Sequence, residues 1–215
     1  MSVVREYVGV SERTVTRAFQ VAIVSVLLAG VATRHVGVVV NAAVALAITF
    51  LPAVLERDFS LPLDPGVTLW ITVALSLHAV GMLGIYTRVW WWDHLTHTLS
   101  ATVVAAVGYA TARVLDEYSD AVHFTRPFLF VYILLFTVAL GVFWEVLEFL
   151  AREVGTLTGH DPVLYQYGVE DTVVDLVFDT VGAIVVALFG SRPVSSLVET
   201  FSHRIEHLRD ESESD

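Results

Sequence analysis

The chain contains no cysteine and no lysine, and it carries few charged residues of either sign. The lack of cysteine excludes disulfides and metal sites held by thiolates. All 12 basic residues are arginines, whereas aspartate and glutamate number 23, giving a formal net charge of −11. This acidity argues against nucleic acid as a partner, since nucleic-acid binding needs a basic surface. It is compatible with a halophilic origin and also with the compositional bias of a GC-rich genome.

Apolar residues are abundant, at 55% of the chain, and the mean hydropathy is +0.69. Several apolar stretches approach the length of about 20 residues that a helix needs to cross a bilayer. We therefore predict an all-α, polytopic transmembrane helical bundle in the cell membrane, contacting membrane lipids, with about six spans. The expected spans are residues 16–33, 36–55, 67–86, 93–115, 127–152 and 171–190.

The distribution of arginine predicts the orientation of this bundle. Nine arginines fall in the N-terminal segment, near the 56–66 and 116–127 connections and in the tail, and three fall on the opposite side. The positive-inside rule then places both termini in the cytoplasm. In the tail, residues 191–215, apolar side chains recur at helical spacing before an acidic end. This pattern indicates an amphipathic helix that lies on the inner membrane face or packs against the cytoplasmic loops.

Three ionisable side chains follow three tryptophans where the fourth span begins, in the stretch "WWWDHLTHTLS". The indoles of residues 90–92 are typical of the aromatic belt at a membrane interface. Asp93, His94 and His97 come directly after them, and Asp93 and His97 are four residues apart. They are therefore expected on one face of the helix, at its outer end.

Acidic residues also occupy the outer parts of the next two spans. Glu145 and Glu148 are three residues apart late in the fifth span. Asp171, Asp175 and Asp179 open the sixth span at four-residue spacing, so their directions drift by only about 40° per step. Each set forms one stripe, and each stripe should face the interior of the bundle because hydrocarbon cannot solvate charge.

Several of these residues also have purely structural interpretations. Asp93 and Asp171 are suited to capping the starts of their helices. Glu148 could pair with Arg152 four residues later. His78 in the third span and Asn41 in the second are compatible with hydrogen-bonded core groups as well as with a site.

So many carboxylates in a low-dielectric region cannot all remain ionised without a cation. Carboxylates with imidazole are suitable ligands for a divalent metal ion, which is the one cofactor that the sequence suggests. The expected metal ligands are Asp93, His97, Glu145, Asp171 and Asp175. Glu148 and Asp179 are the expected catalytic bases, and His78, His94 and Asn41 are further polar groups at the same level.

The segments "WDHLTHTLSA", "FWEVLEF" and "DTVVDLVFDTVGA" resemble the YjdF-like family of bacterial and archaeal inner-membrane proteins, and more distantly the VanZ family. The shared features are Asp93 with His97, Glu145, and the run from Asp171 to Asp179 followed by Gly182. His94 departs from the YjdF-like pattern, which has a basic residue there. The resemblance covers residues 90–190 and implies an inner-membrane protein, but no established reaction.

Three functions remain compatible with the sequence. The first is a metal-dependent hydrolase or transferase acting on a lipid or lipid-linked head group from the outer side. The second is a non-catalytic membrane protein whose polar core is stabilised by a cation. The third is a cation or proton transporter, which is disfavoured because the inner halves of the fourth and sixth spans hold no ionisable group.

Overall fold

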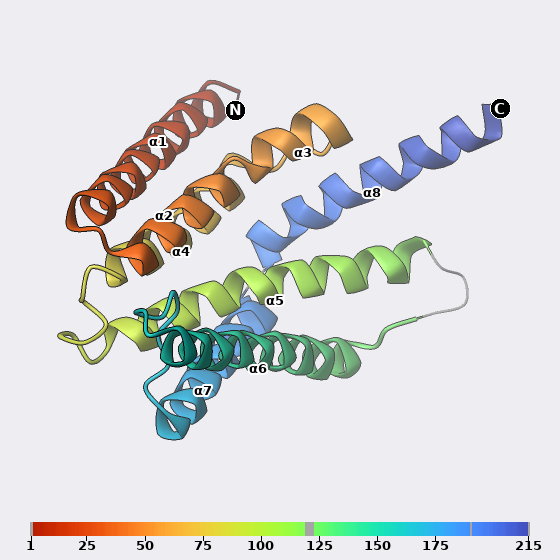
Figure 1. The fold of residues 1–215 in the computed structure, drawn as a ribbon. Coiled ribbons are helices and arrows are strands. Elements are labelled where there is room, and N and C mark those ends of the chain that lie inside the picture. The colour runs from red at the N-terminus through yellow and green to blue at the C-terminus, as the bar shows by residue number, and fades with distance from the viewer. Residues whose placement is uncertain (1, 119–122, 190, 215) are drawn as a thin grey trace.

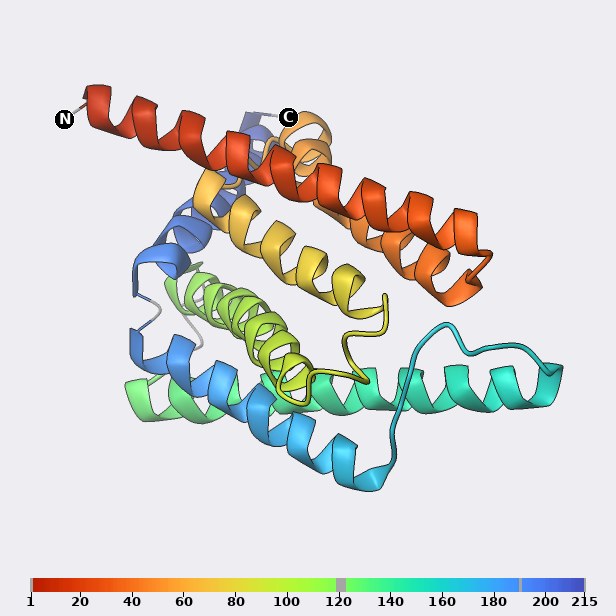
Figure 2. The same ribbon diagram turned by 90° about the vertical axis from the view of Figure 1, so that its left-hand side faces the viewer.

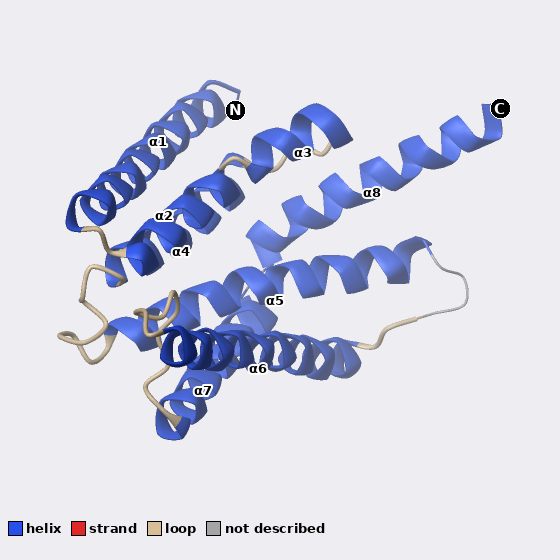
Figure 3. Ribbon diagram, viewed as in Figure 1, coloured by secondary structure: helices blue, strands red, loops and turns tan. Residues whose placement is uncertain are grey.

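The computed structural model describes residues 2–118, 123–189 and 191–214, and within these ranges all regular structure is helical (Figures 1 and 3). Residues 190 and 215, which end the expected sixth span and the tail, lie outside the described residues. The helices are α1 (Ser2–Thr33), α2 (Val36–Thr49), α3 (Leu51–Phe59), α4 (Pro65–Gly81), α5 (Trp92–Tyr118), α6 (Arg126–Thr158), α7 (Val169–Phe189) and α8 (Ser191–Ser214).

Five helical segments of the described chain are long and apolar enough to cross a membrane. They are Glu12–Thr33, Val36–Phe59, Trp92–Tyr118, Arg126–Thr158 and Val169–Phe189. Pro65–Gly81, which corresponds to the expected third span, is also apolar but is shorter than these five segments. The all-helical class and a multi-pass membrane location are therefore confirmed.

The second and third expected spans are interrupted or shortened in the structure. The second is divided at Phe50 into α2 and α3, and Pro52 in the first turn of α3 lacks the N–H that would continue the α2 ladder. The third begins at Pro65, where the Asp64 carboxylate accepts a hydrogen bond from the Gly66 N–H, but it ends at Gly81 rather than at residue 86. Residues 82–91 turn back instead, with Gly84 at φ +89°.

The transmembrane helices form two packed groups that meet at α4 and α5 (Figures 1 and 2). In the first group, α1 packs on α2 and α4, and α2 also packs on α4. In the second group, α5 packs on α6 and α7, and α6 packs on α7. A pocket between the two groups can therefore be lined from both sides.

Three connections lie at one end of the bundle: residues 34–35, 82–91 and 159–168. The last of them rises from the end of α6 toward α2 and then returns to α7 (Figure 2). It is fixed to the first group by the Asn41 amide, which donates to the carbonyl of Val163, and by the Tyr165 hydroxyl, 3.3 Å from Nε2 of His35. This connection covers the end of the space between the two groups.

The tail helix α8 packs on the far end of α5. Leu197 is buried there, with Val198 and Phe201 packed beside it. The Tyr118 hydroxyl donates to the carbonyl of Ser202 at 3.2 Å. In the structure the apolar face of this helix therefore packs against α5.

Candidate functional site

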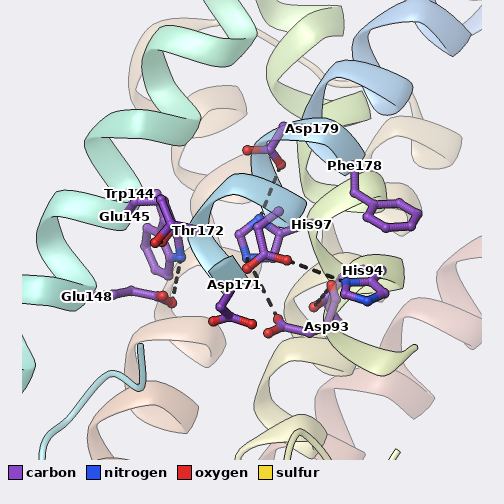
Figure 4. A network of polar contacts seen from close by, with 12 residues as sticks. Asp93, His94, His97, Trp144, Glu145, Glu148, Asp171, Thr172, Phe178 and Asp179 are labelled. Carbon is purple, nitrogen blue, oxygen red and sulfur yellow. Dashed lines mark hydrogen bonds and ion pairs between the residues drawn. The ribbon is translucent and has the colours of Figure 1, made fainter. Parts of the chain in front are cut away.

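His97 lies at the centre of a group of carboxylates near the beginning of α5. Its Nε2 is 3.7 Å from Oδ1 of Asp93, one turn earlier on α5, and 3.9 Å from Oδ2 of Asp175 on α7. Its Nδ1 is 3.3 Å from Oδ1 of Asp179, one turn further along α7 (Figure 4). The two nitrogens of one imidazole thus face different carboxylates.

His94 also contacts Asp175, through the carboxylate oxygen that His97 does not face. Its Nδ1 is 3.6 Å from Oδ1 of Asp175, and its ring stacks on Phe178 with centroids 4.5 Å apart and planes within 2°. Trp90 contacts the opposite part of the ring edge to face, at 5.9 Å. We call Asp93, His94, His97, Asp175 and Asp179 the acid–histidine cluster.

The α5–α7 contact that assembles this cluster is unusually close because Gly182 has no side chain. A Cβ there would lie 2.5 Å from the backbone oxygen of Thr98 and 2.8 Å from the Cβ of Ala101. The four-residue spacings on both helices then bring Asp93 and His97 against Asp175 and Asp179. The stripes expected from the sequence therefore face each other.

Two atoms of the acid–histidine cluster lack hydrogen-bond partners although they are buried: Nδ1 of His94 and Oδ1 of Asp175. Asp175 is only 1% exposed. Buried polar atoms of this kind normally have a partner, because leaving one unpaired costs about 1–3 kcal/mol. These two atoms lie 3.6 Å apart, which is within ion-pair distance if His94 is protonated but is longer than a hydrogen bond.

Three residues of this cluster could together hold a metal ion. Asp93, His97 and Asp175 each offer one ligand atom, and these atoms lie within 4.8 Å of one another. The structure does not bring the two other expected ligands, Asp171 and Glu145, into this group. Asp171 is not the N-cap of α7 but lies inside its first turn, where its carboxylate accepts a hydrogen bond at 3.2 Å from the N–H of Tyr167 in the preceding connection.

The two glutamates of α6 approach from the side opposite His94 (Figure 4). Oε2 of Glu145 accepts from the Thr172 hydroxyl at 2.7 Å, and its buried Oε1 has no partner. Oε1 of Glu148 accepts from the indole N–H of Trp144 at 2.9 Å. Glu145 therefore ties α6 to α7, whereas Glu148 is held by its own helix and lines a cavity.

The expected Glu148–Arg152 pair is not formed. Nη2 of Arg152 lies 3.4 Å from Oε1 of Glu153, and the guanidinium lies over the ring of Phe149. In the part of the chain that the structure describes, no arginine makes an ion pair with any of the six site carboxylates, which are Asp93, Glu145, Glu148, Asp171, Asp175 and Asp179. Histidine is the basic side chain available to them.

Asn41 and His78 form a separate hydrogen-bonded chain beside the site. Nε2 of His78 is 3.1 Å from Oδ1 of Asn41, and Nδ1 is 2.9 Å from the Tyr86 hydroxyl. The Asn41 amide also donates to the carbonyl of Gly37 at 2.9 Å. All polar atoms of these two side chains thus have protein partners, which is the geometry of satisfied core groups.

A cavity of about 310 Å³ adjoins the acid–histidine cluster and lies between the two groups of helices. Asp93, His97, Glu148 and Asp179 line its polar part, together with Tyr86 and Tyr167 from the connections. Partial burial, with a contribution from Asp93, raises the pKa of Tyr167 to about 12, so its hydroxyl stays protonated and can donate a hydrogen bond.

Sequence reasoning missed the tyrosines, Trp144 and Phe178 at this site. Tyr86 and Tyr167 lie in irregular connections, where no periodicity signals the direction of a side chain. Trp144, in contrast, stands four residues before Glu148, and that spacing was a usable signal for their contact.

Comparisons with known proteins give a family but no reaction. The model of a family described as "Predicted membrane protein (DUF2238)" matches residues 15–195, so the chain belongs to this family. An uncharacterised protein of Thermotoga maritima is 26% identical over 140 residues, which cover 64% of this chain and 68% of that protein. No solved structure matches the chain.

Proposed function

We propose that this member of the DUF2238 family is a divalent-metal-dependent hydrolase or transferase that acts on the head group of a lipid or lipid-linked substrate. The observation that carries the proposal is the convergence of ligand atoms from Asp93, His97 and Asp175 within 4.8 Å. The resemblance to the YjdF-like and VanZ families names no reaction, so the proposal depends on this geometry.

A divalent ion suits the charge as well as the positions of these atoms. The site carboxylates have no arginine partner among the described residues, and their mutual repulsion in a low-dielectric region favours a bound cation. One imidazole with two carboxylates leaves coordination positions open, which is typical of catalytic rather than structural sites. An ion held there would lower the pKa of a bound water and polarise an ester or phosphoryl group of the substrate.

Asp179 and Glu148 take different roles in this proposal. When Nδ1–H of His97 donates to Asp179, the lone pair of Nε2 is directed toward Asp93 and Asp175, where the metal would lie. Asp179 is therefore a positioning residue. Glu148 lines the cavity and engages one oxygen with Trp144, so it is the residue suited to accept a proton from the attacking water.

The distribution of arginine along the sequence supports an orientation in the cell membrane in which this end of the bundle lies outside the cytoplasm. The substrate's polar part would then be reached from the outer leaflet. A transport role receives less support, because the cavity lining beyond Asp179 contains no ionisable side chain.

The test is a turnover assay on the purified protein in nanodiscs with a total polar lipid extract, with products followed by mass spectrometry. We expect products that require a divalent metal and that fall about 100-fold or more in Glu148→Gln, as for loss of a general base. Glu153→Gln, an exposed change on the same helix, is the matched control and should keep full activity.

Equal product formation in Glu148→Gln and the wild type would contradict the assignment of the base. Absence of metal-dependent products from a metal-loaded protein would overturn the enzymatic proposal. The remaining function would then be that of a non-catalytic membrane protein whose polar core is stabilised by a cation.

A further inference from the structure

The cavity continues beyond the acid–histidine cluster into an apolar part. On α5 its lining passes from His97 through Ala101 to Val104, which at 1.5 Å per residue is about 10 Å along the helix. On α2 the lining changes in the same direction from Asn41 to aliphatic residues, and on α6 it passes from Trp144 through Leu140 to Thr137. The hydroxyls of Ser100 and Thr137 are the polar groups in this otherwise apolar lining. The apolar lining residues are Val44, Ala45, Ile48, Ala74, Ala101, Val104 and Leu140.

The apolar part opens sideways between α2 and α6. Both helices line it, yet they make no extended contact with each other along their described residues. Three lining side chains of these helices are also exposed, at 53% for Val44, 38% for Ile48 and 41% for Leu140, as expected at the rim of an opening. At this depth the surroundings of a transmembrane bundle are hydrocarbon, so a lipid chain is what meets the opening.

The end of the same cavity is covered. Leu164, Tyr165 and Tyr167 of the 159–168 connection line it, and that connection is fastened to α2 through Asn41. The cluster nevertheless keeps some exposure, since the side chain of Asp93 is 19% exposed. The cavity thus has an apolar side entrance, a covered end and a polar group of side chains between them.

We propose that one hydrocarbon chain of a membrane lipid enters between α2 and α6 and lies in the apolar part of the cavity. The lipid's polar group then lies at the acid–histidine cluster. A volume of about 310 Å³ is at the lower limit of ligand pockets, roughly 300–1,000 Å³, so it accommodates a single chain while the rest of the lipid stays in the bilayer. The position of the head group rests on the proposed function, whereas chain binding stands on the cavity alone.

The probe is a phosphatidylglycerol with a diazirine in one acyl chain, incorporated into nanodiscs with the full chain and activated by light. We expect adducts on the cavity-lining parts of α2, α5 and α6, mapped by mass spectrometry. Val104→Trp fills the apolar part and should lower the yield of these adducts by at least about tenfold. Keeping even two methylene groups of the lipid chain out of the cavity lowers the affinity by about that factor. Val107→Trp, at an exposed position on the same helix, should leave them unchanged.

If Val104→Trp does not fold, Ile48→Trp is the second variant. It narrows the entrance at an exposed position and should also lower the yield of cavity adducts. Equal adducts in the filled and control variants would overturn the inference. So would adducts on the exposed face of α1, at Val21 and Leu28, as abundant as those in the cavity.

Metal binding and turnover are measured on the same samples, which separates the two proposals. Cavity adducts in a protein that binds no metal would overturn the proposed function and support chain binding. Metal-dependent turnover without cavity adducts would overturn chain binding alone.

Discussion

At the scale of single residues, the chemistry of the site depends on the two nitrogens of His97. One is bonded to Asp179 and the other faces Asp93 and Asp175. A neutral imidazole can donate from only one nitrogen, so the bond to Asp179 selects the tautomer whose free lone pair points toward the two other carboxylates. In the proposed metal site, Asp179 would thereby orient the ligating histidine without contacting the ion itself.

Replacing Asp179 should weaken the metal site without abolishing it. We expect Asp179→Asn to lower metal affinity by about 10- to 100-fold, as for other residues that orient a ligating histidine. Asp171→Asn is the matched control, because Asp171 accepts from the Tyr167 N–H and the amide oxygen of asparagine can accept the same bond. Calorimetric titration of the metal-free proteins would measure both, and equal losses in the two variants would contradict the three-ligand site.

At the scale of helices, the sequence predicted which residues share a face. The four-residue spacings of Asp93 with His97 and of Asp175 with Asp179 predicted stripes that the structure brings together, whereas Asp171 at the start of α7 does not join them. Spacing cannot predict which stripes meet, because that depends on how closely two helices approach. Here Gly182 permits the close contact of α7 with α5.

A larger side chain at Gly182 should therefore separate α5 from α7. We expect Gly182→Val to destabilise the bundle by about 1–3 kcal/mol, as for overpacked interiors, and to reduce metal binding with it. Val181→Leu adds volume at an exposed neighbouring position and should change neither. Thermal unfolding in detergent would measure the effect, and an unchanged midpoint in Gly182→Val would show that the contact tolerates a side chain.

The connections were the least predictable elements. Apolar composition alone extended the third span to residue 86, whereas α4 ends at Gly81 and Tyr86 bonds back to His78. The 159–168 connection gave no periodic signal, yet it covers the cavity. Such segments are positioned by individual hydrogen bonds to distant residues, which neither hydropathy nor spacing records.

At the scale of the whole molecule, two groups of helices enclose a cavity with an acidic end and an apolar side. The sequence predicted the bundle and the level of its polar groups, because burial of charge in a membrane restricts where those groups can be. It could not predict the division into two groups, since apolar faces on all the spans are similar in composition.

The absence of cysteine makes the orientation directly measurable. We expect Leu157→Cys, which is 84% exposed at the cavity end of α6, to react with a membrane-impermeant maleimide on intact cells. His123→Cys, exposed just before the opposite end of the same helix, should react only after permeabilisation. The reverse pattern would place the acid–histidine cluster at the cytoplasmic face.

The most direct test of the central claim is the divalent metal content of the protein purified without added chelator. Asp93, His97 and Asp175 predict about one ion per chain in the wild type and a large loss in Asp175→Asn at unchanged helix content. Equal metal content in these two proteins, or a wild type that neither retains nor takes up a divalent ion, would contradict the account.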